Sequence, residues 1–463
     1  MPLTSTNPAT GLEVARYDEM TEAELEAALA AADEAFRAWR TSPLPARAAL
    51  LTRAAAELRA RARDLARLMA EEMGKPLAQG EAEVEKCAWV CEYYATHGAG
   101  MLAPETIATD AARSFVTYQP LGSVLAIMPW NFPFWQALRF AAPALMAGNT
   151  ALLKHAPSVT GCALAIEAIW AAAGAPAGLF QVLRLDEPRV GPVIDDPRVA
   201  AVTLTGSTRA GRAVAARAGA ALKKCVLELG GSDPYVLLDD VDLDQAIALC
   251  VTSRLINSGQ SCIAAKRFIA TRRLAGEVAR RFVDLMRGKT MGDPFSEGVA
   301  LGPLARHDLR DTVHAQVERS VAAGARLLLG GHLPPGPGAY YPPTVLADVR
   351  PGMPAYDEEI FGPVAALITA EDEEDALRIA NDTPFGLGAA VFTRDVARGE
   401  QIATERLDAG SAFVNAFVKS DPRLPFGGIK ASGYGRELSL WGLREFVNVK
   451  TVWVDGGWGV GRG

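Results

Sequence analysis

One cysteine stands in a stretch whose composition suits nucleophilic chemistry. Cys262 lies in Gly-Gln-Ser-Cys-Ile-Ala at 259–264, between a polar run that contains glycine and an apolar segment typical of a strand. Small flanking residues leave room for a substrate carbon and leave backbone N–H groups free to meet a developing negative charge. A lone cysteine is more often a structural residue, so Cys262 needs a second observation beside it.

A carboxylate in a second stretch supplies that observation. Glu228 lies in an otherwise apolar, strand-like segment that ends in the glycine pair Gly230-Gly231. A carboxylate in apolar surroundings costs several kcal/mol unless it is protonated or used in a reaction, so its pKa is expected to be raised. Cys262 and Glu228 are therefore predicted to act as nucleophile and general base.

Strands and helices alternate around both residues. Apolar strand-like segments separated by helical patterns occupy 124–128, 150–154, 180–183, 199–205 and 225–229. A second alternation, from 232 to 415, has strands predicted at 267–271, 326–329, 365–369 and 389–392, and helices at 308–323 and 373–381. This alternation of strands and helices predicts parallel, doubly wound sheets. A chain of 463 residues is long enough for two or three domains.

The region before these strands is predicted to be helical. Thr21 and Glu24 form a capping box at the start of an amphipathic helix. A second helical region begins near Pro45 and ends at Gly74, and a third covers 81–96.

Composition excludes several classes of protein. The chain is 49% hydrophobic and 22% charged, which is typical of a globular protein. Its formal net charge is −7, and the arginines at 59–67 fit a solvated helix face better than a nucleic-acid surface. No signal segment and no membrane-spanning apolar run is present. The six cysteines are dispersed and no third ligand cluster accompanies Cys87 and Cys91, which favours reduced thiols in the cytoplasm and no metal site.

The motifs around Cys262 and Glu228 resemble those of the aldehyde dehydrogenase superfamily. Gly-Gln-Ser-Cys at 259–262 and Leu-Glu-Leu-Gly-Gly at 227–231 carry the resemblance, which is closest to the succinate-semialdehyde dehydrogenase branch. It implies an α/β fold of two doubly wound domains plus a small oligomerisation sheet. The dinucleotide-binding domain would cover 1–101 and 121–230, the catalytic domain 231–431, and oligomerisation or bridging segments 102–120 and 432–463.

The resemblance also assigns roles to individual residues. Cys262 is the nucleophile, Glu228 activates water, and Asn131 stabilises the oxyanion together with the Cys262 backbone N–H. Glu437 is implied to assist water or proton movement. The substrate would contact Phe132, Trp135, Arg139 and Ser420. A nicotinamide dinucleotide would be bound by Pro129, Trp130, Lys154, Pro157, Ser158, Gly206, Ser207, Gly211, Leu229, Glu359 and Phe361.

The cofactor motif departs from the usual dinucleotide fingerprint. No Gly-x-Gly-x-x-Gly occurs, but 206–211 follows a predicted strand and opens a helix, where backbone amides and the Ser207 hydroxyl can hold a pyrophosphate. Relatives that prefer NAD commonly carry a glutamate three positions after the ribose-binding lysine. Here that position is Pro157, so a 2′-phosphate is not repelled and Lys154 can attract it. NADP is therefore the favoured cofactor and NAD the second.

The predicted reaction is NAD(P)-dependent oxidation of succinate semialdehyde to succinate through a thiohemiacetal and a thioester on Cys262. Arg139 and Ser420 are implied to hold the substrate carboxylate. If Arg139 instead pairs with a surface acid, the enzyme is a general aldehyde dehydrogenase or acts on another ω-carboxylated or amino aldehyde. The resemblance further implies a homodimer or homotetramer that associates through 114–119 and 447–454.

Three other functions were weighed against this one. A CoA-acylating enzyme would not need Glu228 as a base. A cofactor-independent cysteine hydrolase would ordinarily pair the thiol with a histidine, and none lies near Cys262 in sequence. An inactive binding protein on this fold would be expected to have lost Cys262 or Glu228, and both are present.

Overall fold

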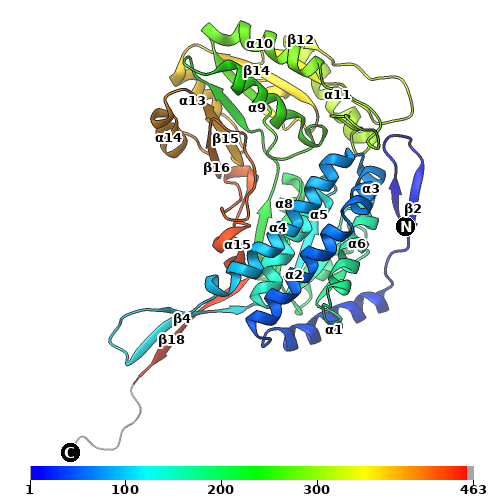
Figure 1. Cartoon of the computed structure of the whole chain (residues 1–463), viewed down its shortest axis with the longest axis vertical. Coiled ribbons are helices and arrows are strands. Elements are labelled where there is room, and N and C mark those ends of the chain that lie inside the picture. The colour runs from blue at the N-terminus through cyan, green and yellow to red at the C-terminus, as the bar shows by residue number, and fades with distance from the viewer. Residues whose placement is uncertain (1, 456–463) are drawn as a thin grey trace, which may run out of the picture.

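The computed structural model describes residues 2–455. Two large sheets form the body of the molecule, and a small sheet projects away from it as an arm (Figure 1). Apolar side chains cover both faces of each large sheet. Within residues 2–455, no helix is long and apolar enough to cross a membrane.

The first large sheet has the strand order β17-β9-β8-β5-β6-β7. Its strands are β5 (Ser123–Met128), β6 (Thr150–His155), β7 (Phe180–Val182), β8 (Val199–Thr205), β9 (Lys224–Glu228) and β17 (Gly433–Tyr434). All are parallel except β17, which runs antiparallel to β9. The chain builds β5, β6 and β7 in one direction and then returns to the other side of β5 with β8. The carboxyl ends of β5 and β8 thus form a topological switch point, where ligands bind in such sheets.

Helices cover both faces of this sheet (Figure 1). The connections contain α5 (Pro133–Ala147), η1 (Pro157–Val159), α6 (Thr160–Ala172), α7 (Val190–Asp195) and α8 (Thr208–Ala220). The N-terminal part adds β1 (Leu3–Thr6), β2 (Glu13–Tyr17), α1 (Glu22–Trp39), α2 (Leu44–Ala60), α3 (Ala62–Met73) and α4 (Leu77–Met101). The Thr21 capping box is confirmed, and Gly74 ends α3 with a left-handed φ of 76°.

The helical region predicted from near Pro45 to Gly74 contains two helices, because the structure divides it at Arg61. That residue leaves helical geometry with φ −110° and ψ 9°. Nothing in the local sequence, which is rich in alanine and arginine, marks the break. Tertiary packing sets it, because both α2 and α3 pack against the single long helix α4.

The second large sheet has the order β12-β13-β14-β11-β10-β15-β16. Its strands are β10 (Pro234–Leu237), β11 (Arg267–Thr271), β12 (Arg326–Leu329), β13 (Thr344–Ala347), β14 (Val364–Ala370), β15 (Gly388–Phe392) and β16 (Ser411–Val414). Only β12 is antiparallel to its neighbour. The helices between them are α9 (Leu243–Leu255), α10 (Arg272–Arg287), α11 (His307–Ala322), α12 (Pro354–Asp357), α13 (Glu373–Asn381) and α14 (Val396–Glu405).

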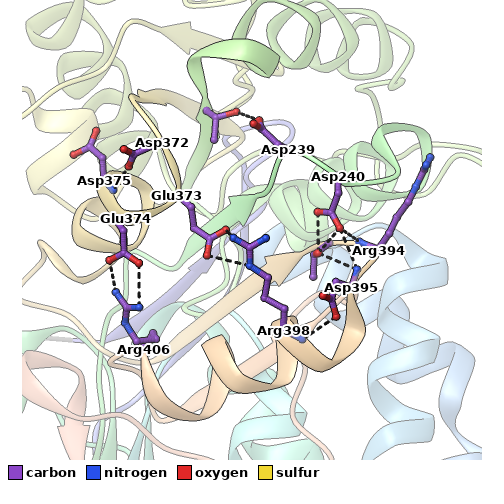
Figure 2. Close-up of polar contacts among 12 residues, drawn as sticks. Asp239, Asp240, Asp372, Glu373, Glu374, Asp375, Arg394, Asp395, Arg398 and Arg406 are labelled. Carbon is purple, nitrogen blue, oxygen red and sulfur yellow. Dashed lines mark hydrogen bonds and ion pairs between the residues drawn. The ribbon is translucent and has the colours of Figure 1, made fainter.

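Charged side chains join α13 to α14 on the surface of this sheet (Figure 2). Glu373 pairs with Arg398 and Glu374 with Arg406. Asp240 accepts hydrogen bonds from Thr393 and from two following backbone N–H groups. Exposed pairs of this kind contribute little to stability, so the buried apolar faces hold this sheet together.

The projecting sheet has the order β18-β4-β3 and is antiparallel. It consists of β3 (Glu105–Thr106), β4 (Arg113–Pro120) and β18 (Val447–Val454), and α15 (Ser439–Glu445) leads into β18. The strands β4 and β18 pair along their whole length, which agrees with the two segments expected to share a protruding sheet. Val449 and Trp453 on β18 are more than half exposed, at 61% and 52%. The arm therefore presents apolar side chains to solvent in the single chain.

Candidate active site

The turn that precedes Cys262 has unusual backbone geometry. After α9 ends at Leu255, the short helix η2 (Ile256–Gly259) contains Asn257, Ser258 and Gly259 with φ values of 53°, 56° and 78°. Residues other than glycine rarely adopt this left-handed region, and such strain persists only where the surroundings enforce it.

Hydrogen bonds and close packing enforce this turn. Asn257 Nδ2 donates to the carbonyl oxygen of Asn131 at 2.6 Å, and Ser258 Oγ donates to that of Gly302 at 3.0 Å. Arg254 Nη2 donates to the carbonyl oxygen of Gly259 at 2.6 Å. A Cβ at Gly259 would lie 2.3 Å from the carbonyl carbon of Gly362, so no larger residue fits there. The loop that presents Cys262 is therefore held rigidly.

Cys262 opens onto a cavity of about 430 Å³. Of the predicted substrate contacts, the structure brings four to this cavity: Phe132, Trp135, Arg139 and Ser420. Asn131 and Glu228 lie outside its lining. Asn131 is nevertheless close to the nucleophile in space, because its Nδ2 donates at 3.0 Å to the carbonyl oxygen of Gln260.

The Cys262 thiol is neutral at rest. Burial raises its pKa to about 12, although the positive charges of Lys266 and Arg139 act in the opposite direction. Lys266 Nζ donates to the carbonyl oxygens of Ser261 at 3.0 Å and of Cys262 at 2.6 Å, so it also fixes the loop. A base must therefore remove the thiol proton before Cys262 can attack.

Glu228 has the environment expected of that base. It ends β9, is 2% exposed, and neither carboxylate oxygen has a hydrogen-bond partner in the described part of the chain. Burial raises its pKa well above the ordinary value, and the negative charge of Glu437 raises it further, against the charge of Arg139. A buried carboxyl that lacks partners and has a raised pKa is typical of a general base.

Arg139 is held by a buried acid. Its guanidinium forms an ion pair with Glu437, lies 3.4 Å from Thr205 Oγ1, and stacks 4.9 Å from the centre of the Phe426 ring. The sequence analysis also considered that Arg139 pairs with an acid on the surface. The observed partner is not such an acid, because Glu437 is only 5% exposed. A role of Arg139 in substrate binding stays a prediction.

A second buried ion pair supports the Asn131 segment. Lys75 and Glu83 pair with side chains only 1% and 2% exposed. Glu83 also accepts from the backbone N–H groups of Phe134 and Trp135, at 3.0 and 2.9 Å, in the first turn of α5. Lys75 donates to the carbonyl oxygen of Asn131 at 3.0 Å. The pair thus fixes both sides of the turn that carries Asn131.

The predicted cofactor residues gather at the switch point of the first sheet. Pro129 and Trp130 follow β5, and Gly206 and Ser207 follow β8. Ser207 caps α8 by accepting from Ala210 N at 3.2 Å, so its hydroxyl and the free amides of this helix start face the same region.

Two further residues test whether a dinucleotide fits. Lys154, near the end of β6, is 7% exposed and makes no hydrogen bond or ion pair with any described residue. The Ser158 hydroxyl is buried and also lacks a partner among residues 2–455. Unpaired buried polar groups are rare in folded proteins, so both fit a polar ligand at this edge. Pro157 between them is exposed.

The remaining predicted residues lie where the two sheets meet. A Cβ at Gly211 would lie 2.5 Å from the Leu229 side chain, so this glycine lets α8 pack closely against the chain after β9. Glu359 accepts from Gly231 N at 3.0 Å and lies 3.4 Å from Lys266 Nζ. The rings of Phe361 and Trp130 meet edge to face with centres 5.8 Å apart. These contacts connect the cofactor region to the Cys262 loop.

Comparisons with known proteins match this arrangement. Residues 2–452 match the model of the aldehyde dehydrogenase family. The chain belongs to that family. It is 51% identical over 451 residues to a succinate semialdehyde dehydrogenase [NAD(P)+] of Escherichia coli (strain K12), which covers 97% of both chains. It is 49% identical to a probable succinate-semialdehyde dehydrogenase [NADP(+)] of Synechocystis sp., over 98% of this chain and 100% of that one.

A solved structure confirms the family's fold in this chain. The succinic semialdehyde dehydrogenase of Streptococcus pyogenes, in complex with NADP+, superposes with a TM-score of 0.96 at 36% identity. The match covers 98% of this chain and 100% of that one. The predicted α/β fold with a small third sheet is therefore confirmed. The residue roles and the domain boundaries at 101, 120, 230 and 431 stay predictions.

Several charged residues that line the cavity escaped the sequence analysis, namely Lys75, Glu83, Lys86, Lys289 and Lys419. Lys86, on α4, lines the cavity with Cys262 and donates from Nζ to Ser420 Oγ at 2.8 Å. A signal for it exists in the sequence. Glu83, Lys86 and Val90 recur at helical spacing, and a charged residue on the apolar face of a predicted helix calls for a partner.

Proposed function

We propose that this aldehyde dehydrogenase oxidises succinate semialdehyde to succinate, with NADP as the favoured cofactor and NAD as the second. The observation that carries the proposal is the cavity itself. A largely apolar space joins the Cys262 thiol to the polar groups of Arg139 and Ser420, which suits a short aldehyde with a charged far end. The names of the Escherichia coli and Synechocystis relatives support the same substrate.

The proposed reaction gives each predicted catalytic residue one role. Glu228 takes the thiol proton, directly or through water, and Cys262 Sγ bonds to the aldehyde carbon. The Cys262 backbone N–H and the Asn131 amide then donate to the oxyanion. A nicotinamide dinucleotide held by the residues after β5 and β8 would supply the hydride acceptor, and loss of the hydride would leave the acyl group on Cys262 as a thioester. Glu228 then releases the thiol proton to solvent and takes one from water, the hydroxide adds to the acyl carbon, and the C–S bond breaks to release the acid, after which the Cys262 thiolate recovers a proton from Glu228.

The cofactor preference rests on three residues at the end of β6. Lys154 and the Ser158 hydroxyl are the polar groups without partners, and both can donate to a 2′-phosphate. Pro157 carries no charge that would repel it. The NADP+ complex of the Streptococcus pyogenes enzyme supports this choice.

Turnover measurements test the proposal directly. Purified protein is assayed with succinate semialdehyde, butanal and an amino aldehyde, each with NADP and with NAD, by following reduced cofactor. We expect the highest kcat/KM for succinate semialdehyde with NADP. Equal values for the charged and uncharged four-carbon aldehydes would identify a general aldehyde dehydrogenase. Turnover of an ester without any nicotinamide as the main activity would instead favour the hydrolase.

We further propose a cytoplasmic homodimer or homotetramer that forms through the projecting arm. Six free thiols are consistent with a reducing compartment. On β18, exposed Val449 and Trp453 beside an open strand edge favour pairing with a second copy. Light scattering of the native protein and of Trp453→Lys tests this. A monomeric native protein would contradict it, and a smaller assembly in the variant would support it.

A further inference from the structure

The cavity contains a cation that no family role assigned above explains. Lys86 lies one turn after Glu83 on α4, and its ammonium group is 4.2 Å from the centre of the Trp135 ring. It donates to Ser420 Oγ at 2.8 Å. Because the ammonium uses Ser420 as an acceptor, the Ser420 hydroxyl hydrogen is left to donate to another group.

The other buried cations of the cavity are already neutralised. Arg139 is paired with Glu437, and Lys75 is paired with Glu83. Glu83 is also engaged by two backbone N–H groups, so it has little capacity left for Lys86. Among residues 2–455, no carboxylate lies within ion-pair distance of Lys86. A half-buried ammonium without a counter-ion is costly, unless a ligand supplies the negative charge.

We infer that Lys86 binds the far carboxylate of the substrate, with the Ser420 hydroxyl as a second donor, and thereby sets the preference for ω-carboxylated aldehydes. This inference rests on the proposed function and moves the main charge contact from Arg139 to Lys86. Arg139 then serves chiefly to hold Glu437 near Glu228. The cavity is polarised accordingly, with the reacting thiol at Cys262 and a free cation at Lys86.

The same geometry gives the contact a pH dependence. Burial lowers the pKa of Lys86 to about 8, and the positive charge of Arg139 lowers it too. Cys87 and Glu83 on α4 and Asp421 beside Ser420 act in the opposite direction. Lys86 is a cation below this pKa and becomes neutral as the pH rises through it. Affinity for a carboxylated aldehyde should therefore fall above about pH 8, whereas affinity for an uncharged aldehyde should not.

Steady-state kinetics of four proteins test the inference. The native enzyme, Lys86→Met, Lys86→Arg and Lys224→Met are assayed with succinate semialdehyde and with butanal from pH 7 to 9. Lys86→Met should lower kcat/KM for succinate semialdehyde about 30-fold or more, mostly through KM, and for butanal by no more than about threefold. Lys86→Arg should keep most of the preference and lose the rise in KM above pH 8. Lys224→Met removes the same charge from an exposed position outside the cavity, and should cost less than about threefold because solvent screens it.

The outcomes separate this inference from the proposed function. If the native enzyme does not prefer succinate semialdehyde to butanal, the proposed function fails first. If the native enzyme has the preference and Lys86→Met keeps it, Lys86 does not bind the carboxylate. Equal losses for both aldehydes in Lys86→Met would indicate a structural role. Should that variant fold poorly, Lys86→Gln takes its place, and an unchanged preference for succinate semialdehyde over butanal in that variant would overturn the inference by itself.

Discussion

Removal of Glu83 should damage both stability and catalysis, although Glu83 touches no reacting atom. Three contacts converge on its carboxylate, namely the Lys75 ammonium and the N–H groups of Phe134 and Trp135. Glu83→Ala leaves Lys75 buried with only the Asn131 carbonyl oxygen and the Phe132 ring, which lies 4.0 Å away. It also leaves two N–H groups at the start of α5 without an acceptor.

The magnitude follows from burial. Both side chains are at most 2% exposed, so the cost of breaking a buried pair applies, about 3–5 kcal/mol, rather than that of a surface pair. Lys75→Met should cost less, roughly 2 kcal/mol, because Glu83 keeps two backbone donors at the positive end of a helix. The double variant should lose less than the sum, with a coupling free energy of about 2 kcal/mol.

Denaturant unfolding at matched protein concentration measures these differences, and initial rates measure the effect on catalysis. We expect kcat to fall in both single variants because the Asn131 turn loses its support, while NADP binding by fluorescence changes little. Glu374→Ala, which breaks an exposed pair with Arg406, is the control and should leave the unfolding midpoint unchanged. Additive stability losses, or full activity in Glu83→Ala, would refute the positioning role.

Four other predictions address the chemistry and the charges around it. Cys262→Ala should reduce aldehyde oxidation to background, and Glu228→Ala should slow both the initial formation of reduced cofactor and steady turnover, because the proposed base acts before and after hydride transfer; full steady activity in either variant would remove that residue from the mechanism. Glu437→Gln removes a charge that raises the pKa of Glu228, so the acid limb of kcat against pH should move to lower pH, and an unmoved limb would show that Glu228 is not the titrating base. Pro157→Glu should shift the NADP/NAD ratio of kcat/KM by about tenfold toward NAD, and an unchanged ratio would place the 2′-phosphate elsewhere. Burial raises the pKa of Asp233 to about 7, so the stability that the protonated carboxyl contributes is complete below the pKa of Asp233 in the unfolded chain and is lost as the pH rises toward 7. Asp233→Asn should therefore flatten the dependence of the unfolding free energy on pH between these two pKa values. An unchanged slope in the variant would contradict this prediction.

Several strands were predicted from the sequence because they are apolar runs. The predicted 267–271 and 326–329 match β11 and β12 residue for residue, and 199–205 matches β8. Three strands of the second sheet were missed, namely β10 (Pro234–Leu237), β13 (Thr344–Ala347) and β16 (Ser411–Val414). Each has four residues, as does the predicted β12, so length alone does not explain the misses; each is defined by hydrogen bonding to strands elsewhere in the sequence.

The proposed nucleophile and the proposed base could be picked out from the sequence because each is unusual in its local context. Glu228 is a charge inside a strand, and Cys262 follows a glycine turn. The partner of Arg139 was not accessible in the same way, because Glu437 lies almost three hundred positions away and meets it only after the glycine-rich segment folds back to pair with β9. Charge pairing is a property of the tertiary structure, so motif matching finds the charged residue without showing whether its charge is already used.

Charged residues of the site that have no partner of opposite charge indicate where a ligand or a reacting group would bind. Lys75, Arg139 and Lys266 each have an acidic partner, and such pairs chiefly fix geometry. Within residues 2–455, Glu228 has no cationic partner and Lys86 has no acidic partner. Burial disfavours the charged form of both side chains. A protein can retain such groups where a reaction or a ligand supplies the opposite charge in turn. In the proposed reaction Glu228 would gain a proton from the thiol or from water, and Lys86 would gain the substrate carboxylate. The two unpaired groups thereby distinguish the chemical end of the cavity from its recognition end.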